Sequence, residues 1–145
     1  MTGRSNYTED YENEWQNIMW RGQVASAIRG KRGQALLREL VETLDAMPDK
    51  RLIRDELVAD APAFVPPEFA RPMVCALGAV GIKRGIELKE IDPEDYNRIA
   101  ETFNIAQQLV REIEWVNDDE ARWASPERRW QIVRDWAAEK LASAR

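Results

Sequence analysis

Histidine is absent from this 145-residue sequence. The chain therefore has no Ser–His or Cys–His nucleophile pair and no imidazole metal ligand. It also has no side chain whose unperturbed pKa lies in the neutral range. We expect a protein that is not an enzyme, with no catalytic residue, no metal and no other cofactor.

Cysteine is nearly absent as well. The single cysteine, Cys75, lies in the apolar run MVCALGAV, so the sequence offers no internal disulfide and no multi-cysteine metal site. We interpret Cys75 as a small buried apolar residue rather than as a reactive thiol.

Long apolar runs are missing too. Every apolar run is far shorter than the roughly 20 residues that a bilayer-spanning helix needs. The first residues, MTGRSNYTEDYENEW, are polar and acidic, unlike a secretory signal. We expect a cytoplasmic protein that does not bind a membrane.

The sequence does contain many apolar residues at helical spacing. They predict a first helix over Asp10–Arg29, preceded by a flexible N-terminus at residues 1–9, and a second helix from about Arg32 or Gln34 to Ala46. The short glycine-containing link predicts that these two helices form an antiparallel hairpin. The apolar stripes are Tyr11, Trp15, Ile18, Gly22, Ala25 and Ile28 on the first helix, and Leu36, Leu37, Leu40, Val41, Leu44 and Met47 on the second.

The rest of the chain also favours helices. We predict them over residues 73–85, from the N-cap signal Asp92-Pro93, over residues 105–116 after a cap at Asn104, and from the N-cap Ser125 onward. Residues 50–60 fit either a short helix or a strand, and their spacing favours the helix. The length suits one domain, so the predicted fold is all-α: a compact single-domain bundle of about five to six helices over residues 1–145.

A proline-rich stretch interrupts this pattern. Residues 60–72 contain four prolines, which exclude a regular helix and predict an extended surface loop. The loop carries Phe64 and Phe69, which we expect to be exposed.

Positive charge gathers in one stretch of an acidic protein. The chain has a net charge of −5, yet residues 21–38 contain five cations and no acid: Arg21, Arg29, Lys31, Arg32 and Arg38. The segment RGKRGQ within this stretch has two interpretations. It is either a solvated turn between helices whose glycines supply the backbone angles, or an anion site at a helix start. The spaced glycines and Lys-Ser/Thr pair of a nucleotide-binding loop are missing.

Six tryptophans are unusual in a domain of this size. Trp15 and Trp130 lie on apolar stripes and are predicted core residues. Trp20 and Trp136 lie off the stripes, next to Arg21 and Arg134. Each of these two either covers the edge of the core beneath an arginine stem or anchors a partner, and the sequence leaves both interpretations open.

Several blocks, taken in order, resemble a family of small uncharacterised proteins encoded by phages and prophages of proteobacteria. The blocks are GRSNY (3–7), WRGQVASAIRGKRGQALLRELVETLDAMPDKRLI (20–53), CALGAVGIKRGIEL (75–88), DPED (92–95), REIEWVNDDE (111–120) and SPERRWQIVRDW (125–136). The resemblance implies a mobile-element setting inside a bacterial host cell and brings no catalytic residue, cofactor or substrate. It is lost at about residues 59–73, where the family has a short link of the Asp-Gly type and this chain has the proline-rich loop.

Three functional hypotheses follow. The first is a non-enzymatic, phage- or prophage-encoded binding protein that contacts a host or phage protein and could inhibit a host or antiviral-defence factor. Its expected partner-binding residues are Trp20, Arg21, Arg29, Lys31, Arg32, Phe64 and Phe69. The second is a small nucleic-acid-associated regulator that uses the basic turn Arg29–Arg32. The third is a carboxylate- and metal-dependent hydrolase built from Glu112, Glu114, Asp118 and Glu120.

Overall fold

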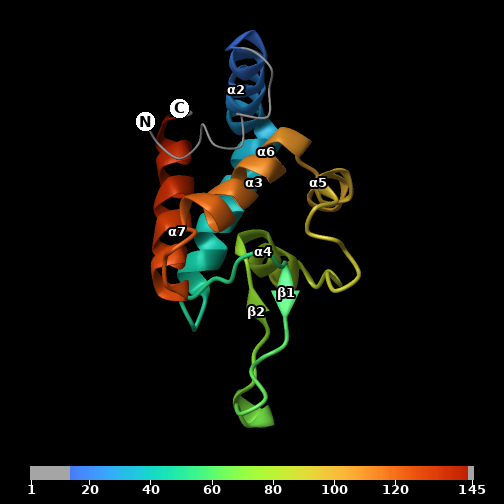
Figure 1. Ribbon diagram of the computed structural model, residues 1–145, viewed down its shortest axis with the longest axis vertical. Coiled ribbons are helices and arrows are strands. Elements are labelled where there is room, and N and C mark those ends of the chain that lie inside the picture. The colour runs from blue at the N-terminus through green and yellow to red at the C-terminus, as the bar shows by residue number, and fades with distance from the viewer. Residues whose placement is uncertain (1–13, 144–145) are drawn as a thin grey trace.

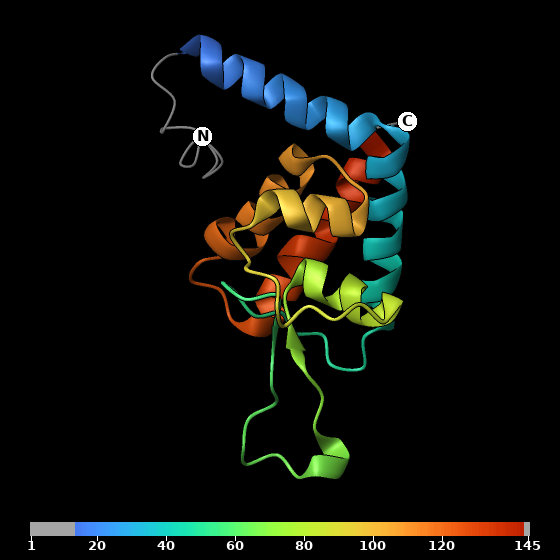
Figure 2. The same ribbon diagram turned by 90° about the vertical axis from the view of Figure 1, so that its right-hand side faces the viewer.

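The computed structural model describes residues 14–143, which form a helical body with two projections (Figures 1 and 2). Six α-helices, a two-stranded sheet and two shorter helical segments are the regular elements of this part of the chain. They are α2 (Glu14–Arg29), α3 (Lys31–Ala46), β1 (Val58–Ala59), the 3₁₀ segment η1 (Pro67–Phe69), β2 (Met73–Val74), α4 (Ala76–Arg84), α5 (Tyr96–Phe103), α6 (Gln107–Trp115), the π-helix η2 (Val116–Glu120) and α7 (Pro126–Ser143). The all-α prediction is confirmed. The expected flexible residues 1–9 lie outside the described residues.

Helices α3 and α7 pack side by side along one side of the body (Figure 1). The predicted stripe on α3 is confirmed, because Leu36, Leu37, Leu40 and Leu44 are all buried. Trp130 of α7 covers one end of this stripe, and its indole N–H donates to the carbonyl oxygen of Leu44 over 3.1 Å. One leucine-rich face thus fixes the position of both helices.

The first two helices do not form the predicted antiparallel hairpin. Figure 2 shows α2 and α3 meeting at a corner, with α2 running across the top of the body. Only Gly30 separates the two helices, which is too short a link for α3 to fold back along α2. A Cβ on Gly33 would lie 1.9 Å from the carbonyl oxygen of Ala27, so Gly33 is needed for close backbone approach. Gly30 has an ordinary φ of −67°, and neither glycine supplies a left-handed angle.

The buried face of α2 also differs from the prediction. Trp20, Val24 and Ile28 face the core, whereas Trp15 is 67% exposed. Trp15 was predicted to be buried because it shares helical spacing with Ile28, but α2 has apolar residues on two sides. A second apolar side makes the core face ambiguous from spacing alone.

Residues 50–60 are not the predicted helix but an extended segment that ends in β1. Its backbone bonds to other parts of the chain: the N–H of Leu52 donates to Pro126, and the N–H of Ile53 donates to Val74. Asp55 has a φ of +68°, which no helix accommodates. Leu52 and Leu57 are buried, so the spacing that suggested a helix reflects separate insertions into the core.

Two predicted helix caps are wrong and one is confirmed. Asp92 accepts from the N–H of Glu94 in a local turn, and α5 is capped three residues later by Asp95. Asn104, with a φ of 56°, ends α5 instead of starting α6. Ser125 does cap α7, since its hydroxyl accepts from the N–H of Arg128 over 3.1 Å.

A buried arginine of α7 joins the extended segment before β1 to η2. The guanidinium of Arg129, on a residue 4% exposed, donates to the carbonyl oxygens of Leu52 and Asn117 over 3.3 and 2.9 Å. The amide of Asn117 in turn donates to the carbonyl of Ile53 and accepts from the N–H of Ala76. These bonds supply the backbone partners that regular structure would otherwise provide.

No helix within residues 14–143 is both long and apolar enough to cross a bilayer.

Candidate functional site

The proline-rich stretch forms an arm, residues 60–72, that projects from the end of the body opposite α2 (Figure 2). It leaves the body at β1 and returns at β2, where the Cα of Ala59 pairs with that of Met73. Near this base, the ammonium of Lys89 contacts the Asp60 carboxylate at 2.7 Å. The body therefore holds both ends of the arm.

The arm presents two aromatic rings to solvent. Phe64 is 86% exposed and Phe69 is 70% exposed, as the sequence predicts. Short backbone bonds shape the intervening chain: the N–H of Val65 donates to Pro62 over 3.0 Å, and the N–H of Phe69 donates to Pro66 over 2.9 Å. Proline fixes φ at four positions, so the arm loses little conformational entropy when it binds.

A shallow groove runs between the arm and the C-terminal end of α4. It encloses about 1060 Å³ of empty space, part of it open to solvent, and its apolar wall includes Ile82, Ile86 and Leu88. Phe64 and Phe69 do not line it. The exposed rings and the groove are thus separate features of one projecting edge.

The basic corner, Arg29 to Arg32, lies at the other end of the molecule from the arm (Figure 2). Arg29 and Lys31 are exposed, and Arg32 donates to the side-chain oxygen of Asn104 over 3.2 Å. The seven residues predicted to bind a partner therefore do not share one surface.

Trp20 and Arg21 are structural residues rather than exposed anchors. Trp20 is only 7% exposed, and the guanidinium of Arg111 lies 4.7 Å from the centroid of its ring. The edge-of-core interpretation of Trp20 is therefore correct, although the covering arginine is not its sequence neighbour. Arg21 forms a two-pronged pair with the buried carboxylate of Glu112, with N–O distances of 3.2 and 3.1 Å. Trp136 is buried as well.

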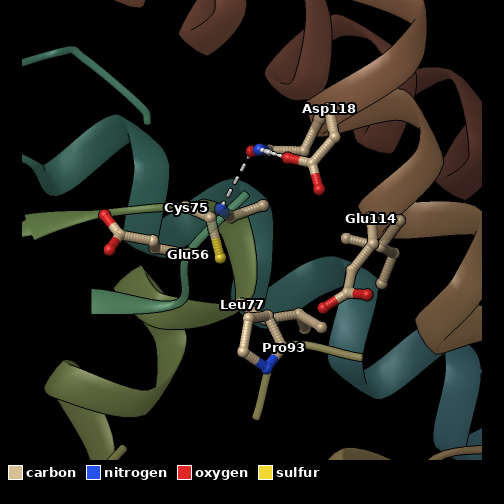
Figure 3. A pocket seen from close by; sticks show the side chains of 9 residues that line it. Glu56, Cys75, Leu77, Pro93, Glu114 and Asp118 are labelled. Carbon is tan, nitrogen blue, oxygen red and sulfur yellow. Dashed lines mark hydrogen bonds between the residues drawn. The ribbon is translucent and has the colours of Figure 1, made fainter. Parts of the chain in front are cut away.

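A second candidate is a small pocket beside the start of α4 (Figure 3). Glu114 and Asp118 reach it from α6 and η2, the sulfur of Cys75 lies near its centre, and Glu56 lies on the opposite side. Its interior has room for about one water molecule, which excludes an organic substrate of ordinary size.

Burial sets the protonation of this pocket. It raises the pKa of Glu114 from 4.5 to about 8, and repulsion by the Asp118 carboxylate adds to the shift. The pKa of Asp118 is also raised by burial, against the opposing effect of hydrogen bonds from Asn117 and from the N–H of Asp55. Burial raises the pKa of the Cys75 thiol to about 12, as a shielded cysteine requires.

The four carboxylates proposed for hydrolysis do not converge. Glu112 is committed to Arg21, Glu120 is exposed, and only Glu114 and Asp118 reach the pocket. Over residues 14–143, no three Cys, Asp or Glu side chains are arranged to hold a metal ion. The geometry gives the hydrolase hypothesis no assembled site.

Comparisons of the chain with protein-family models, with curated proteins and with solved structures found no match. Function is therefore inferred from the residues of this chain and their geometry.

The sequence predictions missed one exposed apolar surface. It is formed by Trp15, Ile18 and Met19 of α2, which are all exposed. Trp123, which precedes α7, is a separate exposed ring, 91% exposed. The available signal was on α2 itself, because Trp20, Val24 and Ile28 form a second stripe with steps of four. Two stripes on one helix mean that one of them faces away from the core.

Proposed function

We propose that this protein is a non-enzymatic binding protein whose arm, residues 60–72, contacts a partner protein through Phe64 and Phe69. One observation carries the proposal: two large apolar rings are held in water on a projecting, proline-stiffened segment. Burying a phenylalanine side chain is worth about 1.5 to 3 kcal/mol, so a partner that covers both rings gains substantial affinity.

The partner's chemistry follows from the arm. Each ring needs an apolar recess, and the arm adds little charge, with only Asp60, Glu68 and Arg71 in its thirteen residues. Aromatic anchors surrounded by polar groups are typical of protein–protein contacts.

The family resemblance supports a biological setting for this contact. A phage- or prophage-encoded protein that binds a host or phage protein, and inhibits a host or antiviral-defence factor, fits a small chain in which the four candidate carboxylates do not converge on one site. This setting and a cytoplasmic location remain part of the proposal.

The test is affinity capture of partner proteins followed by mass spectrometry, with three forms of this protein used as bait in parallel. These are the wild type, the double variant Phe64→Ser and Phe69→Ser, and a control with Trp123→Ser, which removes an equally exposed ring elsewhere. We expect a protein captured by the wild type and by the control to be lost with the arm variant. It should then bind the wild type in purified form. Equal capture by all three forms would refute the role of the arm.

The basic corner supports the second candidate, nucleic-acid binding. Arg29, the last residue of α2, and Lys31, the first residue of α3, are both exposed, and the dipole of α3 also favours an anion at its start. A gel shift at low salt tests this, with the triple charge reversal of Arg29, Lys31 and Arg32 to glutamate as the comparison. A retarded band that weakens steeply with salt and disappears in the variant would support it, and no band would reject it.

A further inference from the structure

Helix α2 has a second apolar face that residues 14–143 leave about half to two-thirds exposed. Successive residues of an α-helix are about 100° apart, so Trp15, Ile18 and Met19 lie roughly opposite Trp20, Val24 and Ile28. The second set is buried, whereas the first three residues are 67%, 56% and 48% exposed. Leaving three large apolar side chains on one face of a projecting helix is typical of an interaction surface.

Side-chain size changes along this exposed face. The N-terminal half carries Trp15, Ile18 and Met19, whereas the C-terminal half carries Gly22 and Ser26. A Cβ on Gly22 would have no atom within 4 Å, so nothing in the described body fills the space above it. A second helix running antiparallel places large residues opposite small ones at both ends. In one such register, Trp15 lies opposite Ser26 and Met19 lies opposite Gly22.

Charge follows the same direction. Glu14 begins α2, and Glu9, Asp10 and Glu12 precede it in the sequence. At the other end of the helix, Arg29 and Lys31 are exposed. An antiparallel neighbour with the same sequence places Glu14 of each copy toward the end of α2 at which the other copy carries Arg29 and Lys31.

We propose that the occupant of this face is a second copy of the chain, paired antiparallel through α2 about a two-fold axis. Such an axis requires a surface that complements itself, because every contact occurs twice. The exposed face of α2 meets this requirement in both size and charge. This dimer does not involve the arm, which projects from the opposite end of the body and remains available.

Sedimentation equilibrium of the purified chain tests the proposal, from about 1 µM to about 500 µM. We expect a reversible monomer–dimer equilibrium. Trp15→Ala should weaken it at least about tenfold, since Trp15 is the largest apolar side chain of the exposed face and tryptophan is enriched among the residues that dominate interface energy. Trp123→Ala is the matched control and should leave the dissociation constant unchanged.

Gly22→Leu separates docking from folding. Gly22 is exposed, a Cβ there meets no atom within 4 Å, and leucine favours the helix more than glycine does, so we expect the monomer to be at least as stable. The dimer should nevertheless weaken at least about tenfold, because the new side chain prevents close approach of the two helices. Circular dichroism during thermal unfolding confirms that the variant folds.

Charge is tested by mixing two variants. Arg29→Glu with Lys31→Glu forms one, and Glu14→Lys forms the other. Each alone should associate more weakly than the wild type, and the mixture should form a heterodimer. A monomer at every concentration would overturn the proposal. So would a dimer that Trp15→Ala and Gly22→Leu leave intact, or one that only Phe64→Ser disrupts.

Discussion

Replacing Glu114 by glutamine should stabilise the protein progressively as the pH rises. Glu114 lines the small pocket beside α4, where burial and the negative charge of Asp118 disfavour ionisation of its carboxyl group. Its pKa in the folded protein is about 8, against 4.5 for a free side chain. Between these values the folded chain binds more protons than the unfolded chain, so stability falls as pH rises through this range. Glutamine cannot ionise, so the variant does not lose this part of its stability as the pH rises.

The magnitude follows from the two pKa values. Their difference corresponds to about 5 kcal/mol of destabilisation once Glu114 is fully ionised in the folded state, which requires a pH above about 8. At pH 5.5 the same relation gives roughly 1 to 2 kcal/mol. The advantage of Glu114→Gln over the wild type should therefore grow by about 3 kcal/mol between pH 5.5 and pH 9.

Urea unfolding at a series of pH values measures this difference. The matched control is Glu101→Gln, an exposed position on α5, whose effect on the free energy of unfolding should not change over the range. An effect of Glu114→Gln that is constant with pH would show that Glu114 ionises freely in the folded protein. That result would refute the account of the pocket.

Three further predictions concern packing, charge and reactivity. Gly33→Ala should lower the free energy of unfolding by about 1 to 3 kcal/mol, because the new methyl group would lie 1.9 Å from a carbonyl oxygen of α2. Gly22→Ala, where the added methyl group meets no atom, should raise it by up to about 1 kcal/mol, and thermal unfolding of the two variants measures the difference. Arg21→Met should lower the free energy of unfolding, measured with urea, by about 3 kcal/mol, because it leaves the 0% exposed carboxylate of Glu112 without this ion pair. Glu112→Gln should lower it less, because the Arg21 side chain is 35% exposed and water can solvate it. Cys75, with a pKa of about 12, should resist iodoacetamide at pH 8 until the chain unfolds, as mass spectrometry would show.

The success of the sequence predictions depended on how many faces of an element are apolar. On α3 the leucines occupy one face, so spacing identified the core correctly. On α2 two faces qualify, and the predicted stripe included Trp15, which is exposed. Residues 50–60 show the converse problem: Leu52 and Leu57 enter the core from an extended segment, which periodicity cannot distinguish from a short helix.

The candidate site could be predicted only where neighbouring residues in the sequence determine the exposure of a side chain. Proline density alone predicted an exposed segment carrying Phe64 and Phe69. The pairing of Arg21 with Glu112 joins positions 91 residues apart, and no local signal could have shown it. No local signal identifies Arg129 either: its sequence context is typical of a surface cation, yet its guanidinium donates to buried backbone carbonyls.

The way the arm is attached has an evolutionary consequence. Its two ends lie on neighbouring strands, about 5 Å apart, so a tight two-residue reverse turn would join the same positions. Doubling the length of a flexible connection costs only about 0.6 kcal/mol, and the body contributes few bonds to the chain between. Insertions, deletions and replacement of the arm therefore change the stability of the fold little. Descendants of one ancestor can change what they recognise while inheriting an unaltered helical core.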